Sequence, residues 1–145
     1  MFVSATRLRV RSVWLLLPFM WRTFGAQRQV VRAPGFAGGR LLIDRQRTFW
    51  TLTAWETDKA MRDYRGSGAH AMVMPRLVGW CDEASVVHWT SESKAIPAWP
   101  EAVEHMRREG RASRVAHPTP DHEALRFPDP RLQPLIGQNL RSKSA

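Results

Sequence analysis

The segment Arg47–Glu56 constrains the fold most strongly, because it has the pattern of a β-strand with two apolar faces. It is rich in aromatic and β-branched residues, which is typical of strands. Successive side chains of a strand point to opposite faces. One face therefore carries Phe49, Thr51, Thr53 and Trp55, and the other carries Trp50, Leu52 and Ala54. Such a strand belongs to a sheet that is covered on both sides.

The apolar periodicity of the remaining chain predicts further strands and helices. We expect strands over residues 2–10, 36–43 and 83–90, and a short edge strand over residues 111–116. We expect helices over residues 18–32, 58–65, 69–78 and 99–108. In the first of these helices, the apolar stripe is formed by Met20, Trp21, Phe24 and Val31.

The order strand, helix, strand, strand, helix, strand is that of a split βαβ, or ferredoxin-like, unit. We therefore expect an α+β fold with an antiparallel sheet. The helices of such a unit cover one face of the sheet only, so the second apolar face needs another cover. A second copy of the same sheet would supply it, which predicts a homodimer that forms a dimeric α/β barrel.

A chain of 145 residues is long enough for one domain. We place this domain at residues 1–116, because residues 117–145 carry five prolines and end in a polar Arg-Ser-Lys-Ser-Ala segment. This proline-rich tail is expected to extend over a partner or to be disordered.

Three features predict a cytoplasmic protein without a membrane partner. The longest apolar run, residues 13–21, is interrupted by Pro18 and is far shorter than the roughly 20 residues that span a bilayer. The first residues lack the pattern of a signal peptide. The single cysteine, Cys81, cannot form an internal disulfide.

The net charge of +9 is concentrated near the N-terminus, where residues 1–47 hold nine arginines and a single acid, Asp44. A nucleic-acid-binding protein would use such a patch to neutralise phosphates. However, 19 of the 22 basic residues are arginine, as a preference for arginine codons would produce, and the chain lacks the aromatic-basic motif of known RNA or DNA modules. We therefore disfavour a nucleic-acid partner.

Three short motifs carry a family resemblance: Gly35–Gly39, Phe49–Thr57 and Gly68–His70. With them, residues 1–92 resemble the dimeric α/β-barrel superfamily that includes the antibiotic-biosynthesis monooxygenases. A strand that ends in tryptophan and an acidic residue, followed by a helix and a histidine, is common there and is matched by Trp55, Glu56 and His70. The pair Gly79-Trp80 is similar to that of an uncharacterised subgroup.

The resemblance implies a cavity between the sheet and its helices in each subunit. Members use this cavity for cofactor-free, quinone-forming oxygenation, for haem binding or breakdown, for polyketide cyclisation, or for aldehyde and isomerase chemistry, so the fold does not select one reaction. Haem-degrading members place their histidine ligand where this chain has Met74, and His70 falls one turn earlier. We expect no cofactor, with haem as the alternative, and no metal site.

His70 is the candidate catalytic residue, because it follows Gly68 at the start of a helix. A neutral imidazole there could accept a proton from a phenolic substrate. The alternative is that His70 caps the helix or bonds a backbone carbonyl.

The candidate substrate-binding residues are Trp55, Trp50, Arg40, Tyr64 and His88. Trp50 and Trp55 lie on opposite faces of one strand, so only one can face the cavity on the helix side while the other faces the second copy. Buried tryptophans usually serve packing. Arg40 could bind a carboxylate or extend to solvent, and His88 could line the pocket or remain in the core.

The leading hypothesis is a small monooxygenase-like enzyme that binds a planar, apolar aromatic or polyenic substrate in a tryptophan-lined pocket. The alternative is a non-catalytic dimer that binds a hydrophobic ligand or haem. Both need the same pocket, so the sequence does not separate them.

Overall fold

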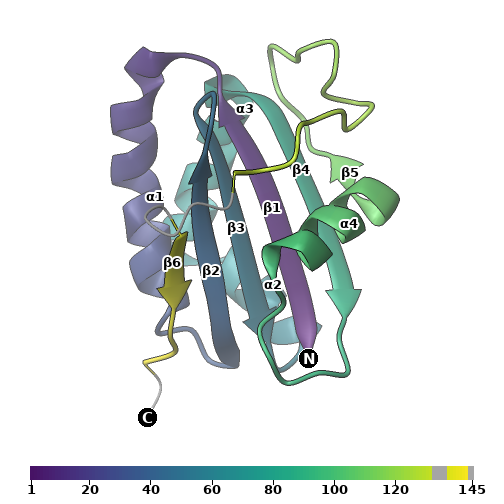
Figure 1. Cartoon of the computed structure of the whole chain (residues 1–145). Coiled ribbons are helices and arrows are strands. Elements are labelled where there is room, and N and C mark those ends of the chain that lie inside the picture. Colours follow the sequence, from purple (N-terminus) through teal and green to yellow (C-terminus); the bar gives the residue numbers. More distant parts are fainter. Residues whose placement is uncertain (132–136, 144–145) are drawn as a thin grey trace.

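The computed structural model describes residues 1–131 and 137–143 and contains a six-stranded antiparallel sheet (Figure 1). Its strand order is β5-β4-β1-β3-β2-β6. The strands are β1 (Phe2–Val10), β2 (Phe36–Asp44), β3 (Thr48–Trp55), β4 (Cys81–Thr90), β5 (Arg111–Ala112) and β6 (Gly137–Leu140). The helices are η1 (Val13–Leu15), α1 (Leu16–Val30), α2 (Asp58–Arg65), α3 (Gly68–Trp80) and α4 (Trp99–Glu109). The predicted α+β, ferredoxin-like arrangement is confirmed.

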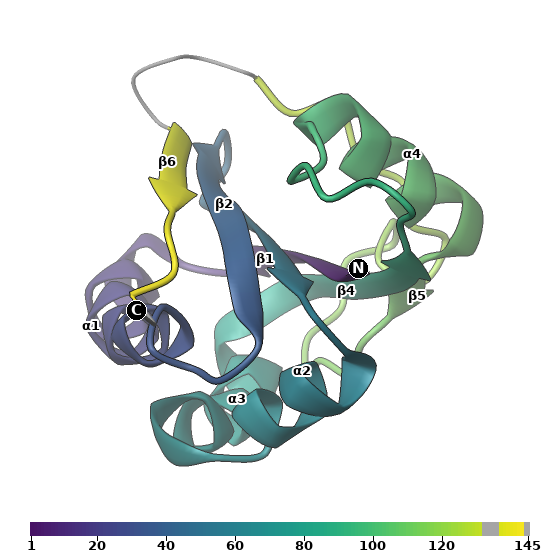
Figure 2. The same ribbon diagram turned by 90° about the horizontal axis from the view of Figure 1, so that it is seen from below.

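Helices lie on both faces of the sheet, whereas the sequence analysis expected them on one face. Helices α1, α2 and α3 cover one face and α4 covers the other (Figure 2). The loop that leads to α4 is held against β2 by Arg40, whose Nε donates to the carbonyl of Pro97 at 3.0 Å. The chain itself therefore covers part of the face that we assigned to a second copy.

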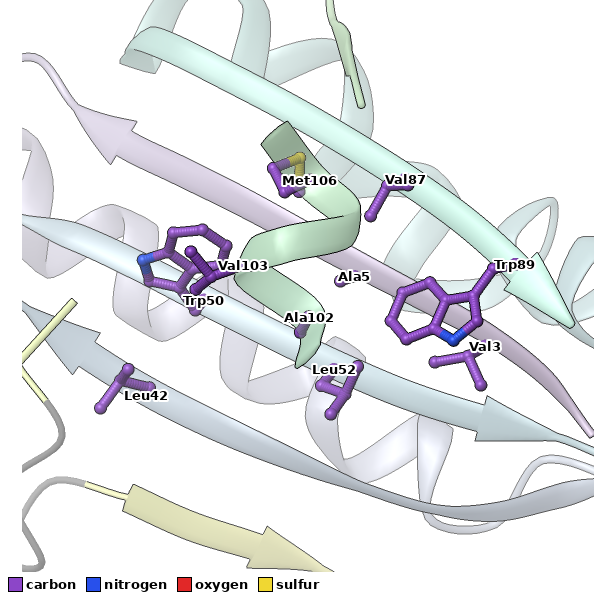
Figure 3. Close-up of a cluster of buried hydrophobic side chains, with 10 residues drawn as sticks. All are labelled: Val3, Ala5, Leu42, Trp50, Leu52, Val87, Trp89, Ala102, Val103 and Met106. Atoms are coloured by element: carbon purple, nitrogen blue, oxygen red, sulfur yellow. The ribbon is translucent and has the colours of Figure 1, made fainter. Parts of the chain in front are cut away.

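Strand β3 lies between β1 and β2 and is buried on both sides, as its sequence predicts. Trp50 and Leu52 belong to the apolar cluster beneath α4 (Figure 3). Phe49 and Trp55 point the other way and pack in the clusters formed with α1, α2 and α3. Helix α4 contributes Ala102, Val103 and Met106 to the first cluster, at the spacing of one helical stripe (Figure 3).

Part of the proline-rich tail packs on the sheet of its own chain. The buried ring of His122 accepts a hydrogen bond from the backbone N–H of Ala84 at 3.3 Å. The ring of Phe127 lies 5.4 Å from that of Trp50, edge to face. Beyond them, β6 pairs with β2 and extends the sheet by one strand.

The apolar stripe predicted for α1 does not face the core. Met20, Trp21 and Phe24 are exposed, and α1 instead buries Phe19, Ala26 and Val30. The helix is apolar on more than one side, so periodicity alone predicted the wrong side.

Among the described residues, every helix falls short of the length and apolar character needed to cross a bilayer.

Candidate functional site

Four rings form a continuous aromatic chain from β2 to the first turn of α3. Phe36 contacts Trp55 at a centroid distance of 5.3 Å, Trp55 contacts Tyr64 at 5.2 Å, and Tyr64 contacts His70 at 4.8 Å. The structure thus brings together three of the predicted site residues, which lie on β3, α2 and α3.

Local sequence signals place these rings. Immediately after β3, the Thr57 hydroxyl accepts a hydrogen bond from the Ala60 N–H and caps α2. Tyr64 lies in the last turn of α2. The backbone then turns at Gly68, whose φ of +55° favours glycine, and α3 brings His70 back onto Tyr64.

Gln29 on α1 joins the three helices. Its side-chain oxygen accepts from the backbone N–H of His70 at 3.0 Å, and its Nε2 donates to the carbonyl of Ser67 at 3.0 Å. A side chain at position 68 would lie within 2.8 Å of the Gln29 amide, so Gly68 is needed for this approach. Nothing in the sequence marks Gln29, because its role depends on the distant α2–α3 turn.

The hydrogen bond of His70 determines its tautomer. Its Nδ1 lies 3.1 Å from the carbonyl oxygen of Arg65. A carbonyl only accepts, so Nδ1 carries the proton and the neutral ring keeps its lone pair on Nε2. Burial lowers the pKa of His70; the nearby Arg65 charge acts in the same direction, while the hydrogen bond to the Arg65 carbonyl opposes them. The ring therefore favours its neutral, basic form.

Tyr64 is half-buried like His70, and Trp55 lies deeper. The Tyr64 hydroxyl donates to the carbonyl of Ala26 at 3.1 Å, and burial raises its pKa, so this phenol stays protonated. Trp55 is 0% exposed and functions as packing behind Tyr64 in this conformation.

A groove of about 740 Å³ runs between α1 and α2 beside this aromatic chain. Tyr64 and Gln29 line it. His70 is not among the lining residues, but its ring contacts Tyr64 and its backbone N–H donates to Gln29. Its walls differ from the expected tryptophan-lined pocket: tryptophan is absent from the described lining, and the charged residues there are Arg28, Arg32, Glu56, Lys59 and Asp63. The sequence analysis proposed none of these five as a binding residue.

The remaining predicted site residues lie elsewhere. Trp50 and Arg40 are on the α4 face, where Arg40 also bonds Asn139 on β6 at 3.2 Å. His88 shares the face of Trp55 and lies 5.5 Å from the ring of Phe2. Burial lowers its pKa, as do the charges of Arg111 and Arg65. Trp50 and Arg40 therefore cannot line the same groove as Tyr64 within one subunit.

No protein-family model matches the chain, and no curated protein matches it. Solved structures do. A Nitrosomonas europaea protein assigned to the antibiotic biosynthesis monooxygenases superimposes with a TM-score of 0.58 at 18% identity, covering 64% of this chain and 100% of that one. SnoaB of Streptomyces nogalater, a cofactor-independent oxygenase whose structure is that of a mutant, gives 0.54 at 16% identity, covering 67% and 97%.

The chain has the fold of the antibiotic-biosynthesis monooxygenases. A Deinococcus radiodurans protein assigned to the same group agrees, with a TM-score of 0.58 at 13% identity and coverage of 68% and 98%. The resemblance predicted from the sequence motifs is confirmed for the fold. In each comparison, about a third of the present chain lies outside the aligned part.

The described lining of the α1–α2 groove contains no histidine that would bind haem iron, and it carries the acidic residues Glu56 and Asp63. Met74, which the sequence resemblance aligns with the histidine ligand of haem-degrading members, has 42% of its surface exposed. The described residues also contain no cluster of three histidine, cysteine or acidic side chains suited to a metal ion.

Proposed function

We propose that the chain is a small monooxygenase-like enzyme that oxidises a planar, mostly apolar aromatic substrate without a cofactor. One observation carries this proposal: the half-buried His70, whose Nδ1 is held by the Arg65 carbonyl, packs its ring on Tyr64, and Tyr64 lines the groove. The fold supports it, because SnoaB is a cofactor-independent oxygenase with the same fold.

In the proposed reaction, the substrate enters the groove between α1 and α2 and stacks on Tyr64. The Nε2 of His70 removes a phenolic proton. The resulting electron-rich anion forms a C–O bond to dioxygen at a ring carbon that carries a hydrogen. The O–O bond then breaks: one oxygen stays on that carbon as the quinone carbonyl, and the other leaves as water with the hydrogen of that carbon and the proton held by His70. The fixed tautomer of His70 orients the base, so that little reorganisation is needed when the proton moves.

The assay measures oxygen consumption with anthrone-like and hydroquinone substrates. We expect turnover by the wild type and a loss of about 100-fold or more in His70→Ala, the range typical of general-base catalysis. His117→Ala is the matched control, because His117 is exposed and lies outside the groove. Equal rates for both variants would refute the role of His70.

Haem binding is tested in the same preparation by titrating haemin and recording the Soret band. We expect no saturable change, since the described lining of the groove lacks a histidine. A band that saturates at one haem per subunit and shifts in His70→Ala would replace the oxygenase proposal with the haem-binding alternative.

We also propose that the protein is a homodimer. Trp50 and Arg40 lie on the α4 face, where a second copy in a dimeric α/β barrel would approach. Any contribution of Arg40 to ligand binding would then come from the space between the two copies and not from the α1–α2 groove, whereas Trp50 is only 1% exposed beneath its own α4.

A further inference from the structure

The outward side of η1 and α1 carries a row of large apolar side chains. The row consists of Trp14, Leu17, Trp21 and Phe24, which are 87%, 79%, 80% and 57% exposed. Their spacing of three, four and three residues places them on one stripe of a helix. In both views α1 lies at the outer rim of the molecule (Figures 1 and 2). We call these four residues the α1 stripe.

The α1 stripe is separate from the contacts that hold α1 in the fold. Phe19, Ala26 and Val30 anchor the helix to the rest of the molecule and are buried. The stripe therefore adds nothing to the core of the described chain. A contiguous apolar patch of this kind on a folded protein marks an interaction surface.

The charges around the stripe restrict its partner. The first acidic side chain of the sequence is Asp44, so α1 carries none. Arg22, Arg28 and Arg32 are exposed on or just after the helix, and the Arg28 guanidinium lies 5.9 Å from the ring of Phe24. A second copy docked through the same stripe would bring two cationic helices together, which like-charge repulsion opposes.

We propose that the α1 stripe docks on the surface of an anionic phospholipid bilayer. Tryptophan, phenylalanine and leucine on one side of a helix, with arginine around them, suit the boundary between lipid headgroups and acyl chains. The aromatic rings insert there while the guanidinium groups stay among the anionic headgroups.

This proposal departs from the prediction of no membrane partner, which rested on the lack of a segment long enough to span a bilayer. The helix lies in the plane of the membrane surface and crosses nothing. Arg28 and Arg32 also line the α1–α2 groove, so docking places the groove beside the lipid. Docking is measured without turnover, and it therefore stands or falls independently of the proposed reaction.

The test is co-sedimentation of the full chain with vesicles of phosphatidylcholine alone and of equimolar phosphatidylcholine and phosphatidylglycerol. We expect binding to the second kind only. Replacing Trp14→Ser and Trp21→Ser together should lower the partition coefficient about tenfold or more, through the loss of inserted apolar area. Ile43→Ser, which removes an exposed apolar side chain from β2, is the matched control and should bind as the wild type does.

Fluorescence gives a second readout, because Trp14 and Trp21 are the strongly exposed tryptophans. Their emission should shift to shorter wavelength when anionic vesicles are added, and the double variant should lose this shift. If that variant does not fold, Arg22→Gln with Arg28→Gln tests the charge component, with the same expected loss of about tenfold.

Four outcomes would overturn the proposal. The wild type could fail to bind anionic vesicles, or the stripe variants could bind as well as the wild type. The double serine variant could instead abolish self-association while vesicle binding persists, which would assign the stripe to a second copy. Binding to heparin or RNA that depends on the arginines alone, without vesicle binding, would assign the surface to a polyanion.

Discussion

Glu83 is the centre of a buried ionic network between β1, β4 and the tail. It accepts hydrogen bonds from Arg7 at 2.6 Å, from Arg9 at 3.1 Å and from Thr119 at 2.8 Å. Burial raises the pKa of Glu83, but the hydrogen bonds from Arg7 and Thr119 and the charges of both arginines outweigh it and hold the pKa below its usual value. The carboxylate is therefore charged in the folded state.

Replacing Glu83→Gln should destabilise the protein by about 3 kcal/mol at neutral pH, because Arg7 would stay buried without its partner. A depressed carboxyl pKa stabilises the fold above the unfolded pKa, and this stability is lost as the pH falls from about 4.5 through the lower folded pKa. Urea unfolding across this range measures both effects. Glu123→Gln is an exposed control and should change neither the stability at neutral pH nor its loss at low pH. If Glu83→Gln lost stability as steeply as the wild type when the pH falls, Glu83 would not be the group responsible.

The lowered pKa of His70 predicts how the proposed activity depends on pH. A general base works when deprotonated, so kcat/KM should rise with pH through the folded pKa of His70. Burial lowers that pKa from its usual 6.5, so the midpoint should lie below 6.5 and activity should be level at neutral pH. The pH–rate profile of the wild type measures this, and a midpoint above 6.5 would show that another group controls the rate.

Phe127 lies in a loop without regular structure and packs against the α4 face of the sheet. Its ring packs on Trp50, and the guanidinium of Arg7 lies 4.9 Å from its centroid. Phe127→Ala should lower the free energy of unfolding by about 2 kcal/mol, which is less than for a fully buried ring because Phe127 is only partly buried. Phe24→Ala removes the same atoms from an exposed site and should cost less than about 0.5 kcal/mol. Similar urea midpoints for both variants would show that the tail does not stabilise the sheet.

At the level of elements, the sequence predicted what periodicity and local signals control. The two faces of β3 and the helices over 58–65 and 99–109 depend on neighbouring residues and were predicted closely. Which side of the sheet receives a helix depends on the path of its connection. The coverage of the second face by α4, and the outward turn of Trp21 and Phe24, therefore could not be obtained from spacing.

The candidate site was predictable only in part, for a related reason. His70, Tyr64 and Trp55 carry recognisable signals, and the structure brings them together. Gln29 and the Arg65 carbonyl, which fix the position and tautomer of His70, carry none. A backbone carbonyl or a single amide becomes part of a site only through tertiary contacts. A single sequence does not show which residues make such contacts.

At the scale of the whole molecule, two elements could pack on the α4 face of the sheet: the chain's own α4 and a second copy. The buried stripe of α4 and the ring of Phe127 cover part of the apolar surface from which we predicted a dimer. We propose that a second copy covers the part of this face that α4 and the tail leave open. Trp50 is only 1% exposed within one chain, so a second copy would contact α4 and the surface around it and not Trp50 itself.

The proposed dimer predicts a mass of twice 16.6 kDa in sedimentation equilibrium. Because association stabilises only the folded state, the melting temperature should also rise with protein concentration. The Trp14→Ser, Trp21→Ser variant should retain both properties, since the α1 stripe lies away from the α4 face. A single species of 16.6 kDa with a constant melting temperature would mean that α4 and the tail have replaced the second copy, and that each chain forms its groove alone.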